Sequence, residues 1–142
     1  MKIRKAKLNE IRKIKKLVDE TKEMDVVKET FSEDYFKRIL KQGILLVAED
    51  ENEIVGVVFG KYHVKEEWAD LLGLVVEKKF RKKGIGTELV KEFEKIIRAK
   101  EIKTIDLYSD KLQVGLFNKL KYNKGRIYVS FRKVLKWTQY KN

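Results

Sequence analysis

The stretch LLGLVVEKKFRKKGIGT, residues 71–87, decides the fold of this 142-residue chain. Its first half is apolar almost without interruption, which predicts a strand covered on both faces, over Trp68–Val76. Its second half is basic, carries two glycines and leads directly into an amphipathic helix. A helix N-terminus leaves backbone N–H groups unpaired, and glycine lets an anion approach them closely. The stretch therefore predicts a seat for a phosphate or pyrophosphate group.

Before this stretch, the pattern predicts a short strand at Ile3–Arg4 and then two helices. Asn9 is the expected cap of the first helix and Ser32 that of the second, which Gly43 ends. Phe31 and Phe36 have the spacing of a hydrophobic staple around Ser32. Two β-rich runs follow, Ile44–Ala48 and Ile54–Phe59, separated by a polar turn, and they indicate a hairpin.

After the stretch, we expect a strand over Ile102–Tyr108, a helix capped by Asp110 and a terminal strand over Arg126–Val134. The whole order is that of a mixed α/β fold built around one central sheet. No linker or repeat divides the sequence, so we expect a single domain over residues 1–142.

Composition narrows the function classes. The chain has no cysteine and one histidine, His63, so we expect neither a disulfide nor a metal site. No GxSxG turn accompanies His63, which disfavours a serine hydrolase. No apolar run is long enough to cross a membrane and no signal peptide is apparent, so a cytoplasmic location is expected. The net charge of +12 favours anionic partners.

The glycine-containing loop has neither the P-loop pattern nor the dinucleotide fingerprint. Its pattern Arg81-x-x-Gly84-x-Gly86 instead resembles the Q/R-x-x-G-x-G/A motif of the GCN5-related N-acetyltransferase superfamily. Lys119-Leu-Lys-Tyr122 is similar to the K-L-G-F that ends the last helix of that family. The resemblance implies a mostly antiparallel sheet, splayed at the cofactor site and flanked by helices. It also implies acetyl-CoA as co-substrate, a primary amine as acceptor and direct attack of that amine on the thioester.

By this resemblance, the backbone of β-strand residues near Leu74 and Val76 pairs with the pantetheine arm, and the loop binds the pyrophosphate through its N–H groups. The expected cofactor-binding residues are Leu74, Val75, Val76, Arg81, Lys82, Lys83, Gly84, Ile85, Gly86 and Thr87.

Three residues are candidates for proton transfer, two as the base and one as the acid. Asp70 falls where the histone-acetylating branch of the family places its general base, and Glu67 is the second choice. Asp70 shares a strand face with Leu74 and Val76 only if no bulge intervenes. The tyrosine that serves many family members as general acid is replaced here by Phe117, so Tyr108 is the expected acid.

Alternatives remain open. The acidic segment Glu20–Asp34 borders the acceptor site by family analogy and favours a basic acceptor. A nucleic-acid-binding module is the second reading, because basic and aromatic residues alternate from Lys119 to Lys136. A third is an inactive acyl-CoA sensor, suggested by Phe117. The tail with Trp137 and Tyr140 is a possible homodimer contact.

Overall fold

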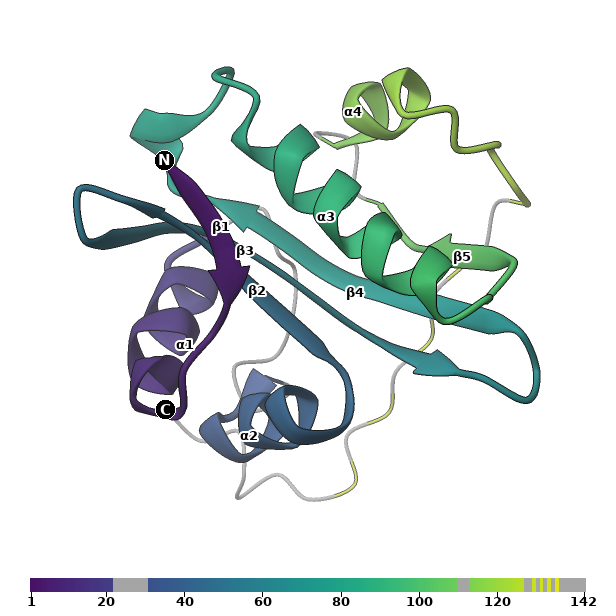
Figure 1. Cartoon of the computed structure of the whole chain (residues 1–142), viewed down its shortest axis with the longest axis horizontal. Coiled ribbons are helices and arrows are strands. Elements are labelled where there is room, and N and C mark those ends of the chain that lie inside the picture. The colour runs from purple at the N-terminus through teal and green to yellow at the C-terminus, as the bar shows by residue number, and fades with distance from the viewer. Residues whose placement is uncertain are drawn as a thin grey trace.

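The computed structural model describes residues 1–21, 31–109, 113–126, 129, 131, 133 and 135. Its centre is one five-stranded sheet in the order β1-β2-β3-β4-β5 (Figure 1). The strands are β1 (Lys2–Lys5), β2 (Ile44–Asp50), β3 (Glu53–His63), β4 (Trp68–Val76) and β5 (Thr104–Leu107). The first four pair antiparallel, and β5 joins the edge of β4 in parallel. The mixed, mostly antiparallel sheet expected from the sequence is confirmed.

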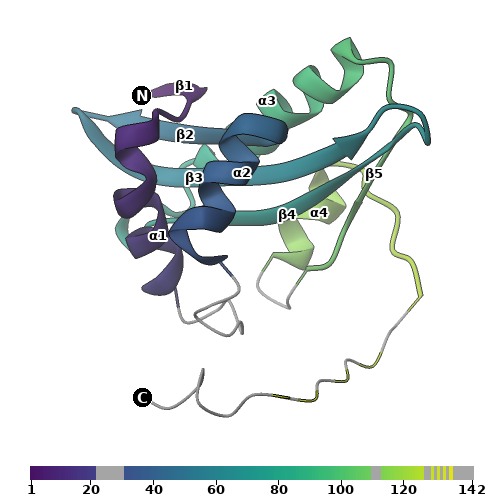
Figure 2. The same ribbon diagram turned by 90° about the horizontal axis from the view of Figure 1, so that it is seen from below.

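Helices cover both faces of the sheet. Helices α1 (Ile11–Asp19) and α2 (Glu33–Gln42) lie together on one face (Figure 2). Helix α3 (Ile85–Ala99) lies on the other face, with the short helix α4 (Val114–Lys119) beside it. Two 3-10 turns complete the described elements, η1 (Leu8–Glu10) and η3 (Lys78–Phe80). Each face has its own apolar cluster, so the sheet is buried on both sides as the apolar run of β4 predicted.

The ends of the first two helices are set by different devices. Ser32 caps α2 as predicted, since its Oγ accepts a hydrogen bond from the N–H of Tyr35 at 3.1 Å. The rings of Phe31 and Phe36 pack 6.1 Å apart around this cap, as a hydrophobic staple does. The prediction that Asn9 caps α1 is wrong, because Leu8–Glu10 forms a 3-10 turn and α1 begins only at Ile11.

The hairpin between β2 and β3 is tighter than the sequence suggested. The strands run on to Asp50 and restart at Glu53, so the connection is the two residues Glu51 and Asn52. Both have positive φ, 48° and 65°, which is the conformation of a two-residue type I′ turn.

A β-bulge in β4 decides which way its side chains point. Phe59 of β3 pairs with Gly73 and Gly60 pairs with Leu71, so Leu72 is an extra residue on β4. Leu71 and Leu74 consequently both pack toward α3, whereas Leu72 packs toward α1 and α2. Alternation from Leu71 then places Asp70 on the α1/α2 face. Asp70 therefore shares its face with Leu72, and Leu74 and Val76 lie on the opposite one.

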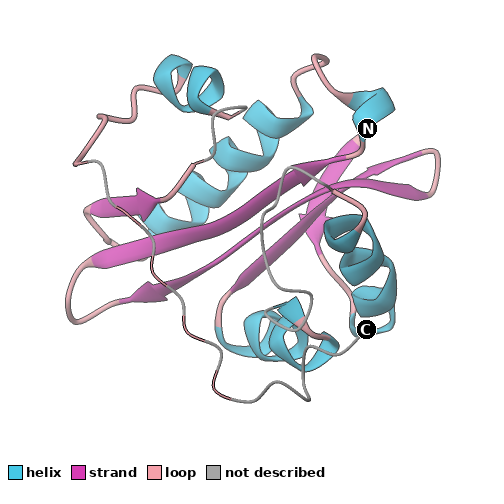
Figure 3. Ribbon diagram, turned by 180° about the vertical axis from the view of Figure 1, so that it is seen from behind, coloured by secondary structure: helices cyan, strands magenta, loops and turns pink. Residues whose placement is uncertain are grey.

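The last predicted elements differ from the sequence analysis. Strand β5 is shorter than the expected Ile102–Tyr108, and its pairing with β4 stops at the pair Leu71–Leu107 (Figure 3, where β5 is the short strand at the left). Beyond this pair, β4 continues without β5. The expected cap Asp110 lies outside the described residues. So does most of Arg126–Val134, and its described residues 126, 129, 131 and 133 are not in a strand.

None of the helices that the structure describes is long and apolar enough to span a bilayer.

Candidate functional site

A cleft of about 700 Å³ opens where β4 continues past the end of β5. Its volume is in the range of sites that bind small molecules and cofactors. One wall is the last part of β4, a second is the η3–α3 loop with the start of α3, and the third is α4. The lining residues are Thr21, Leu74, Val75, Val76, Phe80, Arg81, Lys82, Gly84, Ile85, Gly86, Thr87, Gln113, Gly115, Leu116 and Lys119.

The loop that enters α3 has the conformation of an anion seat. Gly84 is the N-cap residue of α3 and has φ of 84°, and Lys82 two residues earlier has φ of 62°. Positive φ values in a short loop turn successive backbone N–H groups toward one side, where they form a concavity for an anion. The unpaired N–H groups at the start of α3 add to it, and so does the helix dipole. The loop is thus able to bind a phosphate through backbone atoms.

Arg81 fixes this loop to the strand before it. Its Nε donates a hydrogen bond to the carbonyl oxygen of Val76 at 2.9 Å. The side chain of Arg81 therefore holds the phosphate-binding loop against the end of β4, which explains an arginine at this position by a contact within the protein.

The open edge of β4 presents backbone groups to the cleft. The carbonyl oxygens of Leu74 and Val76 accept hydrogen bonds from the Gln113 and Arg81 side chains, so both point away from β3. The N–H groups of the same two residues point the same way, because a strand alternates its hydrogen-bonding direction residue by residue. An extended ligand can pair with this edge as an added strand would.

Nine of the ten residues expected to bind the cofactor line this single cleft. The exception is Lys83, whose Nζ lies 5.4 Å from the centre of the Phe80 ring, outside the cleft lining. The sequence pattern indicates the loop side of the cleft but not the α4 side. Gln113 is the main omission: its Nε2 donates to the carbonyl of Leu74 at 2.7 Å across 39 residues of sequence. The only sequence feature that could have pointed to Gln113 is its position directly before α4.

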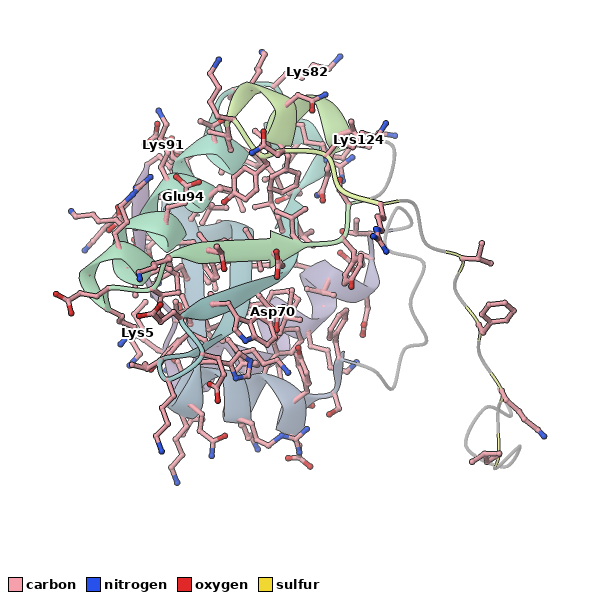
Figure 4. The ribbon with its side chains drawn as sticks, turned by 90° about the vertical axis from the view of Figure 1, so that its right-hand side faces the viewer. Lys5, Asp70, Lys82, Lys91, Glu94 and Lys124 are labelled. Atoms are coloured by element: carbon pink, nitrogen blue, oxygen red, sulfur yellow. The ribbon has the colours of Figure 1, made fainter. Side chains whose placement is uncertain are left out.

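Asp70 lies on the α1/α2 face, in a row of charged side chains that crosses three strands. Its register partner on β3 is Lys61 and its partner on β5 is Asp106. Figure 4 shows Asp70 just below β5, on the side of the sheet away from the α3 residues Lys91 and Glu94. The side chain of Asp70 is 21% exposed, so its carboxylate is accessible.

The Asp70 carboxylate has the His63 imidazole of β3 as a neighbour. His63 Nε2 lies 3.8 Å from Asp70 Oδ2, and the His63 ring stacks on Trp68 with centres 4.2 Å apart. Burial raises the pKa of the Tyr35 phenol; the negative charge of Asp70 raises it further, and Arg38 opposes both. Asp70 and Arg38 are thus both near the Tyr35 ring. The His63 ring is held by stacking on Trp68, and its Nε2 is buried without a hydrogen-bond partner among the described residues.

The remaining catalytic candidates are separated by the fold. Tyr108 directly follows β5, past the last β4–β5 pair, and is 88% exposed. Glu67 lies in the β3–β4 turn and its Oε2 pairs with Lys103 Nζ at 3.1 Å. Phe117 is only 5% exposed and packs in the α3-side core against Tyr122, at 5.3 Å between ring centres. Phe117 therefore has no direct access to the cleft.

The structure adds little support to the two hypotheses based on charge, which are a nucleic-acid-binding face and an acidic border of the acceptor site. Tyr122 is half-buried and its Oη donates to Glu94 Oε2 at 2.8 Å; burial and this bond raise the pKa of the Tyr122 phenol. It is therefore a core residue and not an exposed platform for a base. Arg132, Lys136 and Trp137 lie outside the described residues, as do positions 22–30 of the acidic segment. Within the described ranges, no group of three His, Cys, Asp or Glu side chains is placed to hold a metal ion.

The cleft joins the open edge of β4 to a glycine-containing helix N-terminus, so its geometry suits an extended ligand that carries a phosphate group. The profile of the acetyltransferase (GNAT) family matches residues 9–122. The chain belongs to this family.

Solved structures support the fold. An aminoglycoside acetyltransferase from an uncultured soil metagenomic sample, in complex with sisomicin, is 21% identical, with a TM-score of 0.68 over 95% of this chain and 96% of that one. A PaiA N-acetyltransferase from Thermoplasma acidophilum in complex with coenzyme A is 20% identical, with a TM-score of 0.72 over 84% and 85%. A transcriptional regulator from Bacillus halodurans is 20% identical, with a TM-score of 0.74 over 93% and 99%. A comparison with curated protein sequences gave no match.

Proposed function

We propose that this chain is a single-domain N-acetyltransferase that transfers the acetyl group of acetyl-CoA to a primary amine by direct attack. The observation that carries the proposal is the junction of the open β4 edge with the N-terminus of α3 in one cleft. The pantetheine arm fits the edge at Leu74 and Val76, and the pyrophosphate fits the loop at Gly84. Membership of the family and the coenzyme A bound by the PaiA enzyme support this assignment.

The chemistry follows from where the β4 bulge lies. The thioester would reach the bulge next to Leu72, because the pantetheine runs along β4 toward it. Asp70 lies two residues away, roughly 7 Å along the strand, on the α1/α2 face, which we take as the acceptor face. Its carboxylate takes a proton from the attacking ammonium, directly or through one water. The neutral nitrogen forms the N–C bond and a tetrahedral intermediate, the nitrogen loses its second proton to solvent, the C–S bond breaks, and the thiolate leaves.

We propose Tyr108 as the group that protonates the departing thiolate. It follows β5 directly, one residue past the pair of Leu107 with Leu71, and its side chain is exposed. Coenzyme A thiolate is a good leaving group, so this step needs less help than the removal of the ammonium proton. We expect Tyr108→Phe to lower kcat by about tenfold or less, and Asp70→Asn to lower it by roughly 100-fold or more.

The test is a calorimetric titration with acetyl-CoA followed by an assay of coenzyme A release with a panel of amines. We expect micromolar binding by the wild type and loss of binding when Gly84 and Gly86 are both replaced by leucine. The matched control is Gly125→Leu, since a side chain there would meet open space. A folded wild-type protein that does not bind acetyl-CoA would refute the proposal. Binding without coenzyme A release from any amine would favour the sensor.

A further inference from the structure

A second hollow, of about 360 Å³, lies on the α1/α2 face between α2 and the strands β3 and β4. Its lining includes Tyr35, Arg38 and Gln42 from α2, Lys61 from β3 and Leu72 from β4. Leu72 is the bulge residue of β4, so this hollow reaches the sheet two residues from Leu74, which lines the acetyl-CoA cleft. The two cavities therefore approach the bulge from different faces of the sheet.

The hollow carries two cations without an internal partner. In the part of the chain that the structure describes, neither Arg38 nor Lys61 forms an ion pair or a side-chain hydrogen bond. Both residues are exposed, so water screens the repulsion between their two positive charges when no anion is bound. An arginine and a lysine that converge on one cavity are a common way to bind a carboxylate.

The opposite charge lies immediately beside these cations. Asp70 is the register partner of Lys61, and antiparallel partners have Cα atoms roughly 5 Å apart. Asp106 follows in the same row on β5, about 4.8 Å further across the sheet. Arg38 lies one turn beyond Tyr35 on α2, and both residues line the hollow. The acceptor face thus offers a carboxylate pair for an ammonium next to a cation pair for an anion.

We propose that the acceptor is a small amine that also carries a carboxylate, with its ammonium at Asp70 and its carboxylate bound by Arg38 and Lys61. This inference rests on the proposed function. Only a few bonds separate the two charges of such an acceptor, and the register places Lys61 directly opposite Asp70. A polyamine or an aminoglycoside would instead bring further positive charge against Arg38 and Lys61, which disfavours it.

The test compares acceptors that differ only in the anion. Initial rates are measured with 4-aminobutyrate and β-alanine, with the amide of each, and with a diamine of similar length. We expect the wild-type KM to be at least about tenfold lower for each acid than for its amide, and the diamine to be the poorest acceptor. Equal use of acid, amide and diamine would overturn the inference.

Single variants assign the effect to the two cations. Arg38→Ala and Lys61→Ala should each raise KM for the acids by about tenfold and leave KM for the amides unchanged. Arg38→Lys should restore part of the loss. Lys37→Ala, an exposed lysine of the same helix outside the hollow, is the matched control and should change nothing. An equal rise in KM for acids and amides would show a structural role and refute the assignment.

Binding separates this inference from the proposed function. If acetyl-CoA binds but no acceptor is acetylated, the protein saturated with coenzyme A is titrated with each acid and its amide, followed by NMR. The same tenfold preference for the acid, lost in Arg38→Ala, would support the carboxylate site, and equal affinities would overturn it. If acetyl-CoA itself does not bind, the proposed function fails, and the same titration of the free protein decides the carboxylate site alone.

Discussion

Two glycines only two residues apart, Gly84 and Gly86, should respond to substitution in opposite ways. Gly84 has φ of 84°, where an L-residue with a side chain is strained, although a Cβ there would meet no atom within 4 Å. Gly86 is the second residue of α3, and a Cβ there would lie 3.5 Å from Leu116 Cδ2 and 3.8 Å from Leu74 Cδ2. These are ordinary contacts, so alanine fits at Gly86 without displacing its neighbours.

The magnitudes follow from these geometries. Gly84→Ala should cost about 1–2 kcal/mol of stability, the penalty of the left-handed conformation, and lower Tm by roughly 3–8 °C. Gly86→Ala should leave stability unchanged or raise it by up to about 1 kcal/mol, because alanine favours a helix over glycine. Its affinity for acetyl-CoA should change by less than about threefold. Gly86→Leu should fold normally, since its added atoms enter the cleft, yet bind acetyl-CoA about 100-fold more weakly or worse.

The assays are thermal unfolding and calorimetric titration with acetyl-CoA on all three variants, with Gly125→Leu as the control. A Gly84→Ala variant as stable as the wild type would contradict the loop conformation. A Gly86→Leu variant that folds and still binds with full affinity would refute the placement of acetyl-CoA in this cleft, whatever its activity.

Three further outcomes are expected. Asp70→Asn should lower kcat and leave the affinity for acetyl-CoA within about twofold, and the loss should shrink at high pH, where the amine is already neutral; equal losses at all pH values would argue against a base. Gln113→Ala removes the donor to the Leu74 carbonyl and frees that group for a ligand N–H, so acetyl-CoA should bind about threefold to tenfold more tightly in calorimetry; weaker binding would mean that Gln113 itself contacts the ligand. Arg4 lowers the pKa of the Glu10 carboxyl through hydrogen bonds of 2.7 and 2.9 Å. This pair therefore contributes stability above about pH 4.5 that is lost as the pH falls further, and Arg4→Met should cost about 1–2 kcal/mol at pH 7 and flatten the acid slope of Tm; an unchanged slope would exclude this pair as its source.

Local sequence patterns predicted much of the fold. The bounds of β4 agree with the predicted Trp68–Val76, because a continuous apolar run followed by a basic glycine-containing loop has few other solutions. The Ser32 cap with its staple depends only on neighbours in the sequence, so it too was predictable. Asn9 misled because Glu10 sets the turn before α1: its carboxylate accepts from the Lys7 N–H at 2.8 Å and is held by Arg4 of β1.

The candidate site also has a part that local sequence predicted and a part that it did not. The loop side of the cleft was predictable from sequence, because a phosphate site made of backbone N–H groups requires glycines at a recognisable spacing. The α4 side was not, since Gln113 meets Leu74 only through the folded chain. The hollow with Arg38 and Lys61 joins a helix to a strand, and nothing in the sequence brings those two cations together.

The sequence alone therefore determined the family, the order of most elements and the loop that is able to hold the phosphates, because each depends on residues close together along the chain. Only the tertiary structure decided what faces the acceptor. One extra residue, Leu72, shifts the register of β4 against β3 and separates the face of Asp70 from that of Leu74 and Val76. Side chains alternate with a period of two, so a one-residue bulge reverses the face of everything beyond it, and the length of the strand gives no sign of this.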